Sequence, residues 1–363
     1  MLKTVGVLTG GGDCPGLNAV IRSVVKSCRG YGMTVWGIKN GFGGLVKNEM
    51  TKLSLRDTAG LLARGGTILG TTNRDNPFHF PVEGINGETV YADMSGQAIR
   101  NLQAHQIEAL IVIGGDGSLY IANELHAKYA FPVVGVPKTI DNDLPETERT
   151  FGFDTAVSIA TEALDRLHTT AESHHRVMLL EVMGRYAGWI ALHAGIGGGA
   201  DCILIPEIPF RLAAVLHKIK ERKAQGKLFS IIVVAEGAFP EGGSMTVARV
   251  IEGSADKIRL GGIGNKLVSM IEEQGQMETR CTVLGHLQRG GSPTAYDRIL
   301  ATRYGVAAAE AVRDEEFGCM VALQNNAIRR VPLARVVGKP FKVPPEHELI
   351  KVGRSIGVSF GDI

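Results

Sequence analysis

Two segments of this chain place a short run of apolar, mostly β-branched residues directly before a glycine-rich turn. Residues 4 to 9 precede the glycines at 10 to 12, and residues 109 to 113 precede a second such turn at 114 to 118. After each turn, apolar residues recur at helical spacing. Strand, turn and helix in this order are typical of parallel α/β layers, and we expect both runs to be buried strands.

The same order of elements starts again after about residue 150. Further strands are expected at residues 132–136, 176–182, 202–205, 230–235 and 279–284, with helices at 156–170 and 211–225. Glycine- and proline-rich stretches at 81–88 and 238–244 are expected to be exposed loops. The pattern therefore predicts an α/β protein with mainly parallel sheets.

Length and composition fit two globular domains. The chain has 363 residues, of which 44% are hydrophobic and 21% charged, whereas a common domain has about 100 to 200 residues. Lys and Arg total 39 against 37 Asp and Glu, so the net charge of +2 predicts no general attraction to nucleic acid or membrane. Five cysteines without a Cys-x-x-Cys pair, and no apolar run long enough to span a membrane, lead us to expect a cytoplasmic protein.

The two glycine-rich turns suit phosphate binding. Around Gly12, residues without a side chain let backbone N–H groups approach oxyanions at a helix N-terminus, although a plain tight turn explains these glycines equally well. The second turn places one carboxylate among glycines, which favours a magnesium ion bridged to phosphates over a hairpin turn: Gly115, Asp116, Gly117 and Ser118. Similar loops occur in kinases of NAD and of lipids, so this turn indicates phosphoryl transfer without naming the acceptor.

A third polar loop, Thr139-Ile-Asp-Asn-Asp143, follows the strand expected at 132–136. In an extended loop, Asp141 and Asp143 point to the same side. An exposed aspartate has a pKa of about 3.9, so it is ionised near neutrality and able to accept a hydroxyl proton. Taken by itself, the segment is better explained as a solvated Asp/Asn turn.

Several basic residues fall near the ends of predicted strands or in the loops after them: Arg176, Arg185, Arg280, His286 and Arg289. Guanidinium groups match phosphate oxygens in bidentate geometry, which suits a sugar phosphate. Any one of these arginines is more often a surface salt-bridge partner. The chain contains neither a Gly-x-x-x-x-Gly-Lys-Ser/Thr loop nor a His-Glu-x-x-His helix.

Taken together, these blocks resemble the 6-phosphofructokinase family, and the resemblance covers roughly residues 4 to 310, including a long block at 278–293. It implies two stacked Rossmann-like three-layer α/β/α domains with mainly parallel sheets. Residues 1–152 with about 288–338 would bind the phosphoryl donor. Residues 153–287 with about 339–363 would bind fructose 6-phosphate.

The resemblance also implies the reaction, which is phosphorylation of the 1-hydroxyl of fructose 6-phosphate, with Asp141 as general base and Thr139 and Arg185 as further catalytic residues. Asp116 and Asp143 would hold Mg²⁺. Residues implied at the donor are Gly12, Arg74, Gly115, Asp116, Gly117, Ser118 and Lys138. Residues implied at the sugar phosphate are Thr139, Asp141, Arg176, Met183, Gly184, Arg185, Glu236, Arg280, His286 and Arg289.

The resemblance further implies a homotetramer, because Arg176 and Arg280 would reach into the site of a neighbouring subunit. Arg22 and Lys26 resemble part of an allosteric effector site in shorter bacterial members, and a solvated helix face explains them equally well.

Two positions bear on the phosphoryl donor. Gly117 matches family members that use ATP, whereas relatives that use pyrophosphate commonly carry an aspartate there. Lys138 resembles the pyrophosphate branch. An aspartate at position 117 would exclude a nucleotide by its bulk and its negative charge, and this effect on donor choice is stronger than that of one additional cation at position 138. We therefore expect ATP as the donor, with pyrophosphate as the alternative donor.

More distant alternatives are a kinase of NAD or lipids and a regulatory paralogue without activity. A paralogue of that kind would be expected to have lost one of the residues implied in the chemistry, and all are present: Asp116, Asp141, Asp143 and Arg185.

Overall fold

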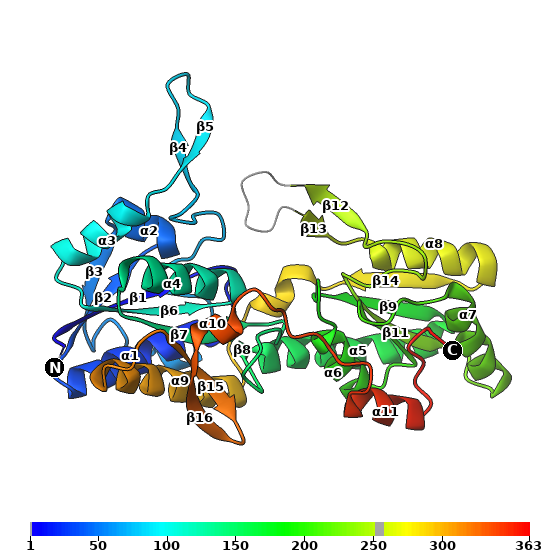
Figure 1. The fold of residues 1–363 in the computed structure, drawn as a ribbon. Coiled ribbons are helices and arrows are strands. Elements are labelled where there is room, and N and C mark those ends of the chain that lie inside the picture. The colour runs from blue at the N-terminus through cyan, green and yellow to red at the C-terminus, as the bar shows by residue number, and fades with distance from the viewer. Residues whose placement is uncertain (1, 251–257) are drawn as a thin grey trace.

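The computed structural model describes residues 2–250 and 258–363 and contains two main β-sheets arranged side by side (Figure 1). The larger sheet has the strand order β16-β15-β7-β6-β1-β2-β3, with β8 paired to β7. Its strands are β1 (Thr4–Thr9), β2 (Thr34–Ile38), β3 (Met50–Leu53), β6 (Ala109–Gly114), β7 (Val133–Thr139), β8 (Phe151–Gly152), β15 (Cys319–Gln324) and β16 (Ala327–Pro332). Its pairs are parallel except β2 with β3 and β15 with β16.

The second sheet has four strands in the order β10-β11-β9-β14, and all of its pairs are parallel. They are β9 (Val177–Val182), β10 (Cys202–Leu204), β11 (Ser230–Ala235) and β14 (Thr279–Val283). Both β9 and β11 are buried along their whole length, which is why they are continuous apolar runs in the sequence.

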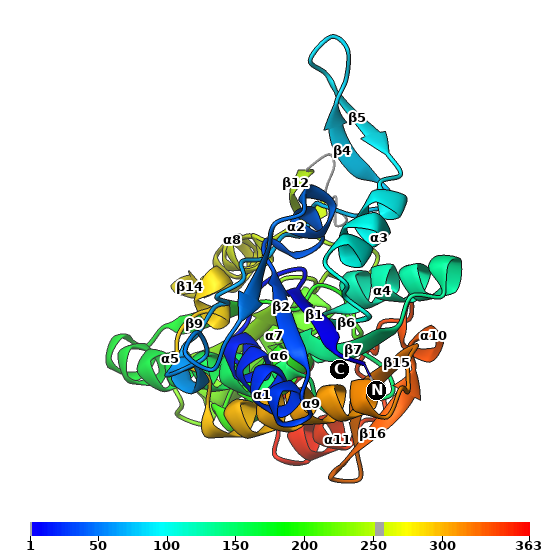
Figure 2. The same ribbon diagram turned by 90° about the vertical axis from the view of Figure 1, so that its left-hand side faces the viewer.

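Helices cover both faces of the larger sheet (Figure 2). Alternate strand side chains point to opposite faces, so Val5 and Val7 join the core beneath α1 (Leu17–Gly30) and α9 (Ala295–Arg313). Leu110 and Val112 join a separate core beneath the helices of the other face. Those helices are α2 (Gly41–Lys47), α3 (Ser95–Ala104), α4 (Asp116–Tyr129) and α10 (Leu333–Val336).

The second sheet is layered in the same way. Leu180 and Val182 face α5 (Phe153–His174) and α6 (Trp189–Gly197), whereas Leu179 faces α7 (Leu212–Ala224) and α8 (Ile263–Gly275). The remaining helical elements are α11 (Glu348–Ser355) and the 3₁₀ turns η1 (Leu61–Ala63) and η2 (Gly285–Arg289). The core that contains Val7 of the larger sheet also contains Leu180 of the second, so one apolar cluster joins the two sheets.

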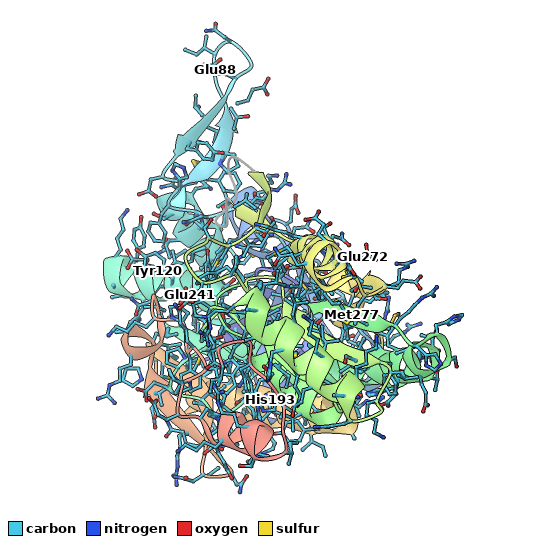
Figure 3. All side chains as sticks on the ribbon, turned by 90° about the vertical axis from the view of Figure 1, so that its right-hand side faces the viewer. Glu88, Tyr120, His193, Glu241, Glu272 and Met277 are labelled. Carbon is cyan, nitrogen blue, oxygen red and sulfur yellow. The ribbon has the colours of Figure 1, made fainter. Side chains whose placement is uncertain are left out.

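Two small hairpins stand apart from the main sheets: β4 (Phe80–Glu83) with β5 (Thr89–Ala92), and β12 (Val247–Val250) with β13 (Ile258–Leu260). The first projects from the body of the molecule, with Glu88 near its tip (Figure 3). The loop expected at 81–88 is therefore wrong at residues 81 to 83, which form a strand. Val82 pairs across the ladder with Val90, and only the turn that follows is a loop.

The stretch at 238–244 has no helix or strand, as expected, but it is not wholly exposed, because Ala238 is buried and Pro240 bridges to Phe210. The other expected strands and helices all form, although the helix expected at 156–170 is longer, spanning Phe153–His174. The predicted α/β class with mainly parallel sheets is confirmed. Within residues 2–250 and 258–363, no helix combines the length and apolar character that crossing a membrane would take.

Candidate active site

Three polar loops meet at one edge of the larger sheet, because β1, β6 and β7 are parallel neighbours and each ends there. The first loop follows β1 and is held by its own backbone. The Gly10 N–H donates to the Ile113 carbonyl at 2.9 Å, and the Gly11 N–H donates to the Thr72 carbonyl at 3.0 Å. These two N–H groups therefore form hydrogen bonds within the protein and do not point to a ligand. A Cβ at Gly12 would lie 2.9 Å from Nη1 of Arg289, so a side chain there would collide with a cation expected at the site.

The second loop follows β6 and leads directly into α4, whose first residue is Asp116. Gly114 packs against the first turn of the helix, since a Cβ there would lie 2.3 Å from Cβ of Ser118. A Cβ at Gly117 would meet no atom within 4 Å, so this position faces open space. The loop thus presents a helix N-terminus with Asp116 in its first turn and room beside it.

The third loop follows β7 and folds back onto β8. The Asp141 N–H donates to Oγ1 of Thr139 at 3.1 Å, and Oγ1 of Thr150 donates to the Thr139 carbonyl at 2.7 Å. Asp141 and Asp143 are both only partly exposed. Burial, followed by repulsion from Asp141 and from Asp116, raises the pKa of the Asp143 carboxyl. The loop is therefore a buttressed acidic turn beside the second loop, unlike the solvated Asp/Asn turn of the alternative interpretation.

Lys138 links the first and third loops. Its side chain is buried, and its Nζ donates to the carbonyl of Gly12. The pKa of the Lys138 ammonium is lowered to about 8, mainly by burial and also by the neighbouring Arg289, while Asp13 and Asp141 oppose the shift. A positive charge therefore lies between the glycine loop and the acidic turn.

The second sheet contributes residues that follow its own strands. Met183, Gly184 and Arg185 come directly after β9, and the Met183 N–H donates to Oε1 of Gln288 at 3.2 Å. Gly237 follows β11, and its N–H donates to the Gly184 carbonyl at 3.1 Å. These loops pack so closely that a Cβ at Gly237 would lie 1.9 Å from the Arg185 carbonyl oxygen.

Glu236 shows that loops from both sheets converge. Burial raises the pKa of its carboxyl to about 7, repulsion from Asp141 adds to this, and Arg185 and Arg289 oppose it. Arg289 in η2 also donates from Nη1 to the Asp13 carbonyl at 3.0 Å. The predicted residues Asp141, Arg185 and Arg289 therefore all lie within electrostatic reach of Glu236.

The carboxylates of this site suit a divalent cation shared with a ligand. Asp141 and Asp116 both repel Asp143, and this repulsion helps to raise the pKa of the Asp143 carboxyl. Across the described ranges, however, no group of three or more His, Cys, Asp and Glu side chains is arranged to hold a metal by itself. Mg²⁺ commonly takes only one or two carboxylates and completes its shell with phosphate oxygens and water. The donor set fits that mode of binding.

Arg74 and His286 are exposed at the margin of the site. The Arg74 N–H donates to Oγ1 of Thr72 at 3.2 Å, and Thr72 contacts the first loop through its carbonyl. His286 lies in η2, three residues before Arg289.

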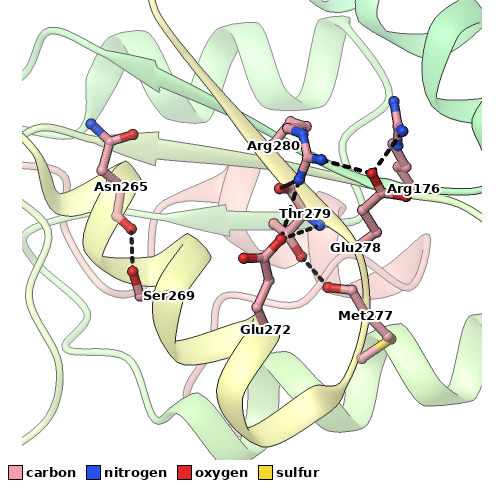
Figure 4. Close-up of polar contacts among 8 residues, drawn as sticks. All are labelled: Arg176, Asn265, Ser269, Glu272, Met277, Glu278, Thr279 and Arg280. Atoms are coloured by element: carbon pink, nitrogen blue, oxygen red, sulfur yellow. Dashed lines mark hydrogen bonds and ion pairs between the residues drawn. The ribbon is translucent and has the colours of Figure 1, made fainter.

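Arg176 and Arg280 do not join this site within one chain. Arg176 immediately precedes β9 and Arg280 lies near the start of β14, whereas Met183 follows the far end of β9, about 20 Å away at the usual strand rise. Figure 4 shows that one oxygen of Glu278 holds both guanidinium groups, each at 2.7 Å. These two arginines therefore form their own cluster at the amino ends of the strands.

Some contacts at the site had no sequence signal. The Gly338 N–H donates to Oδ1 of Asp116 at 2.8 Å, and the Phe341 N–H donates to the Asp143 carbonyl at 2.7 Å. Gln288 lies within a recognised block, but its contact with Met183 crosses 105 residues of chain. No local pattern predicts such pairings.

This chain is similar to known phosphofructokinases along almost its whole length. Residues 4–312 match the family model described as Phosphofructokinase. The chain is 54% identical to the ATP-dependent 6-phosphofructokinase 2 of Clostridium perfringens (strain 13 / Type A), over 99% of each chain. It is 51% identical to the pyrophosphate–fructose 6-phosphate 1-phosphotransferase of Amycolatopsis methanolica, over 94% of this chain and 97% of that one.

Among solved structures, Pichia pastoris phosphofructokinase in the T-state superposes with a TM-score of 0.80 at 31% identity. That match covers 98% of this chain and 39% of the Pichia chain, which is the longer of the two.

Proposed function

Because the chain belongs to the phosphofructokinase family, we propose that it transfers a phosphoryl group from ATP to the 1-hydroxyl of fructose 6-phosphate. The observation that carries this proposal is the electrostatic interaction of Glu236, which follows β11 of the second sheet, with Asp141, which follows β7 of the larger sheet. A base that lies between a phosphate-binding loop and a polar pocket on another sheet suits the transfer of phosphorus to an alcohol.

Asp141 would accept the proton of the 1-hydroxyl as the oxygen attacks phosphorus. The Thr139 hydroxyl accepts the Asp141 N–H, which orients the base, and it also hydrogen-bonds to the Asp143 side chain. Arg185 would stabilise negative charge on the transferring group, with Arg74 closing the site from its exposed loop. Asp116 and Asp143 would hold Mg²⁺, which when bound neutralises the phosphate oxygens.

The two sheets would divide the substrates. The larger sheet, with the loops at Gly12, Gly115–Ser118 and Lys138, would bind the donor, in a domain of residues 1–152 with about 288–338. The second, in residues 153–287 with about 339–363, would bind the sugar through Met183, Gly184 and Glu236. Arg289 and His286 would take the 6-phosphate.

The cluster of Arg176 and Arg280 supports a homotetramer. Since both arginines lie at the amino ends of their strands, they would complete the 6-phosphate site of a neighbouring subunit.

All five cysteines are thiols without disulfide partners, which supports the cytoplasm as the location.

Pyrophosphate is the second candidate donor, and Lys138 is the observation that favours it. Its buried ammonium beside the Gly12 carbonyl could balance a compact donor that carries no nucleoside. The open space at Gly117 favours ATP, because nothing within 4 Å of that position obstructs a nucleotide.

The donor is tested by measuring fructose 1,6-bisphosphate formation with MgATP and with Mg-pyrophosphate in parallel. We expect turnover with ATP, and we expect Gly117→Asp to abolish it while fructose 6-phosphate binding stays measurable. Turnover with pyrophosphate alone would replace ATP as donor, and retained ATP turnover in Gly117→Asp would refute the steric argument.

A further inference from the structure

We propose that residues 337 to 343, called here the C-terminal strap, position the Asp116 carboxylate for the phosphoryl donor, and that Phe341 and Trp189 hold the strap in place. Phe341 and Trp189 would act as positioning residues, and neither belongs to the three polar loops after β1, β6 and β7. This positioning role rests on the proposed function only for the identity of the donor.

The strap runs from the larger sheet to the second. It leaves α10, which packs in the core beneath α4, and reaches α11, which packs on α6 (Figure 1). On the way it passes the carboxyl ends of the strands that carry the candidate site. A segment with this path is suited to fix the donor side of the site relative to the sugar side.

On the donor side, the strap bonds to both acidic loops through its backbone. Gly338 has a φ of +73°, a conformation that glycine adopts without strain, and its N–H donates to Oδ1 of Asp116 at 2.8 Å. Three residues later, the Phe341 N–H donates to the Asp143 carbonyl at 2.7 Å. The strap therefore touches both residues that would hold Mg²⁺.

On the sugar side, the strap is anchored to α6, which begins seven residues after Val182. Nε1–H of Trp189 donates to the Phe341 carbonyl at 2.9 Å, and the two rings stack at 5.2 Å with 21° between their planes. Oε1 of Glu207 accepts from the Val343 N–H at 2.8 Å and from the Gly188 N–H at 3.0 Å. Trp189 is only 3% exposed, so this anchor belongs to the core.

The contact with Asp116 leaves the carboxylate able to bind a metal. A carboxylate offers about four acceptor sites, and one N–H occupies one of them. Fixing the side chain in advance removes the rotamer entropy that a ligand would otherwise have to offset on binding. Groups that orient a metal ligand from behind commonly change metal affinity about 10- to 100-fold when they are removed.

The experiment compares ligand binding in Phe341 variants. The protein contains two tryptophans, so a Trp36→Phe background leaves Trp189 as the only one and makes its fluorescence a reporter of the strap. In that background, Phe341→Ala removes the stacking partner and Phe341→Tyr keeps it. Phe341 is 38% exposed, and Tyr91→Ala on the distant β4–β5 hairpin is a matched control, because Tyr91 is 40% exposed and stacks on His79 at 4.1 Å.

Each variant is titrated calorimetrically with a non-hydrolysable ATP analogue plus Mg²⁺, and separately with fructose 6-phosphate. We expect Phe341→Ala to weaken binding of the analogue by about tenfold while fructose 6-phosphate binding changes by less than about twofold. Phe341→Tyr and Tyr91→Ala should match the parent. In kinetics, KM for MgATP should rise with little change in KM for the sugar phosphate.

Unchanged analogue binding in Phe341→Ala would overturn the proposal, and so would an equal loss for both ligands, because general loosening of the fold would then explain it. Mg-pyrophosphate serves as a second probe, so that the result does not depend on which donor is used. A parent protein that binds the donor but fails to phosphorylate fructose 6-phosphate would refute the proposed function and leave this comparison intact.

Discussion

Glu236 and Lys138 owe their charge states to residues that are far away along the chain. Burial raises the pKa of Glu236 to about 7 and lowers that of Lys138 to about 8, and Asp141 and Arg289 act on both groups. The sequence was sufficient to predict that these side chains belong to one site, through the resemblance of separate blocks. It could not predict the shifts, because they arise from desolvation and from neighbours on other loops.

The raised pKa of Glu236 predicts how stability depends on pH. Between about pH 4.5 and pH 7 the folded protein retains a proton that the unfolded chain releases, so the free energy of unfolding falls as pH rises through that window. Above about pH 7, the contribution of the protonated Glu236 carboxyl to the free energy of unfolding is lost completely. Glu236→Gln removes the buried charge, and its melting temperature should exceed that of the wild type by about 2 °C or more at pH 8.

This difference should shrink towards pH 5, where the wild-type carboxyl is protonated in the folded protein. Thermal unfolding of both proteins at pH 5 and pH 8 provides the measurement. Glu88→Gln near the hairpin tip is a control for the removal of a carboxylate far from the two main sheets. The same offset at both pH values in Glu236→Gln would contradict the proposed cause.

At the scale of elements, the central strands of both sheets were predictable because parallel strands buried on both faces leave continuous apolar runs, as in β9 and β11. The outer strands β2, β3, β15 and β16 of the larger sheet were not predicted. Parallel order then implied that the loops after β1, β6 and β7 would meet. The β4 strand was missed because glycine and proline around it resemble a loop. The strap was missed because its bond to Asp116 spans 222 residues and uses only a backbone N–H, which leaves no mark on residue type.

The close approach of two loops leads to a prediction about Gly237. Because a Cβ there would lie 1.9 Å from the Arg185 carbonyl, Gly237→Ala must displace one of the two loops. A shift of about 1 Å in a catalytic group lowers rates by roughly a hundredfold, and we expect a loss of that order in kcat/KM.

Gly30→Ala is the matched control, because a Cβ at that position meets nothing within 4 Å. We expect its steady-state rates to equal those of the wild type. Wild-type activity in Gly237→Ala would mean that Arg185 does not depend on this packing.

At the scale of the whole molecule, the two sheets share one apolar core, while the residues predicted to bind the 6-phosphate are divided between two places. Arg289 lies near Asp13 and Glu236, and Arg176 and Arg280 lie with Glu278 at the other end of the strands. The proposed site, completed by a neighbouring subunit, would explain why these residues lie in two places.

This arrangement predicts complementation between inactive chains. In the proposed shared site, one chain supplies Asp141 and the neighbouring chain supplies Arg280. When the Asp141→Ser and Arg280→Ala variants are unfolded and refolded together, some sites should therefore contain neither substitution. We expect the activity of the mixture to exceed the sum of the two variants refolded separately. Activity no higher than that sum would argue that each site is built from one chain.

In the proposed function, Asp141 faces the sugar alcohol where the two sheets meet. The rate of fructose 1,6-bisphosphate formation, measured for the wild type and Asp141→Ser at saturating MgATP and fructose 6-phosphate, tests it most directly. We expect kcat to fall about a hundredfold or more in the variant, since that is the usual contribution of a positioned base, with both KM values little changed. A turnover near that of the wild type would contradict it.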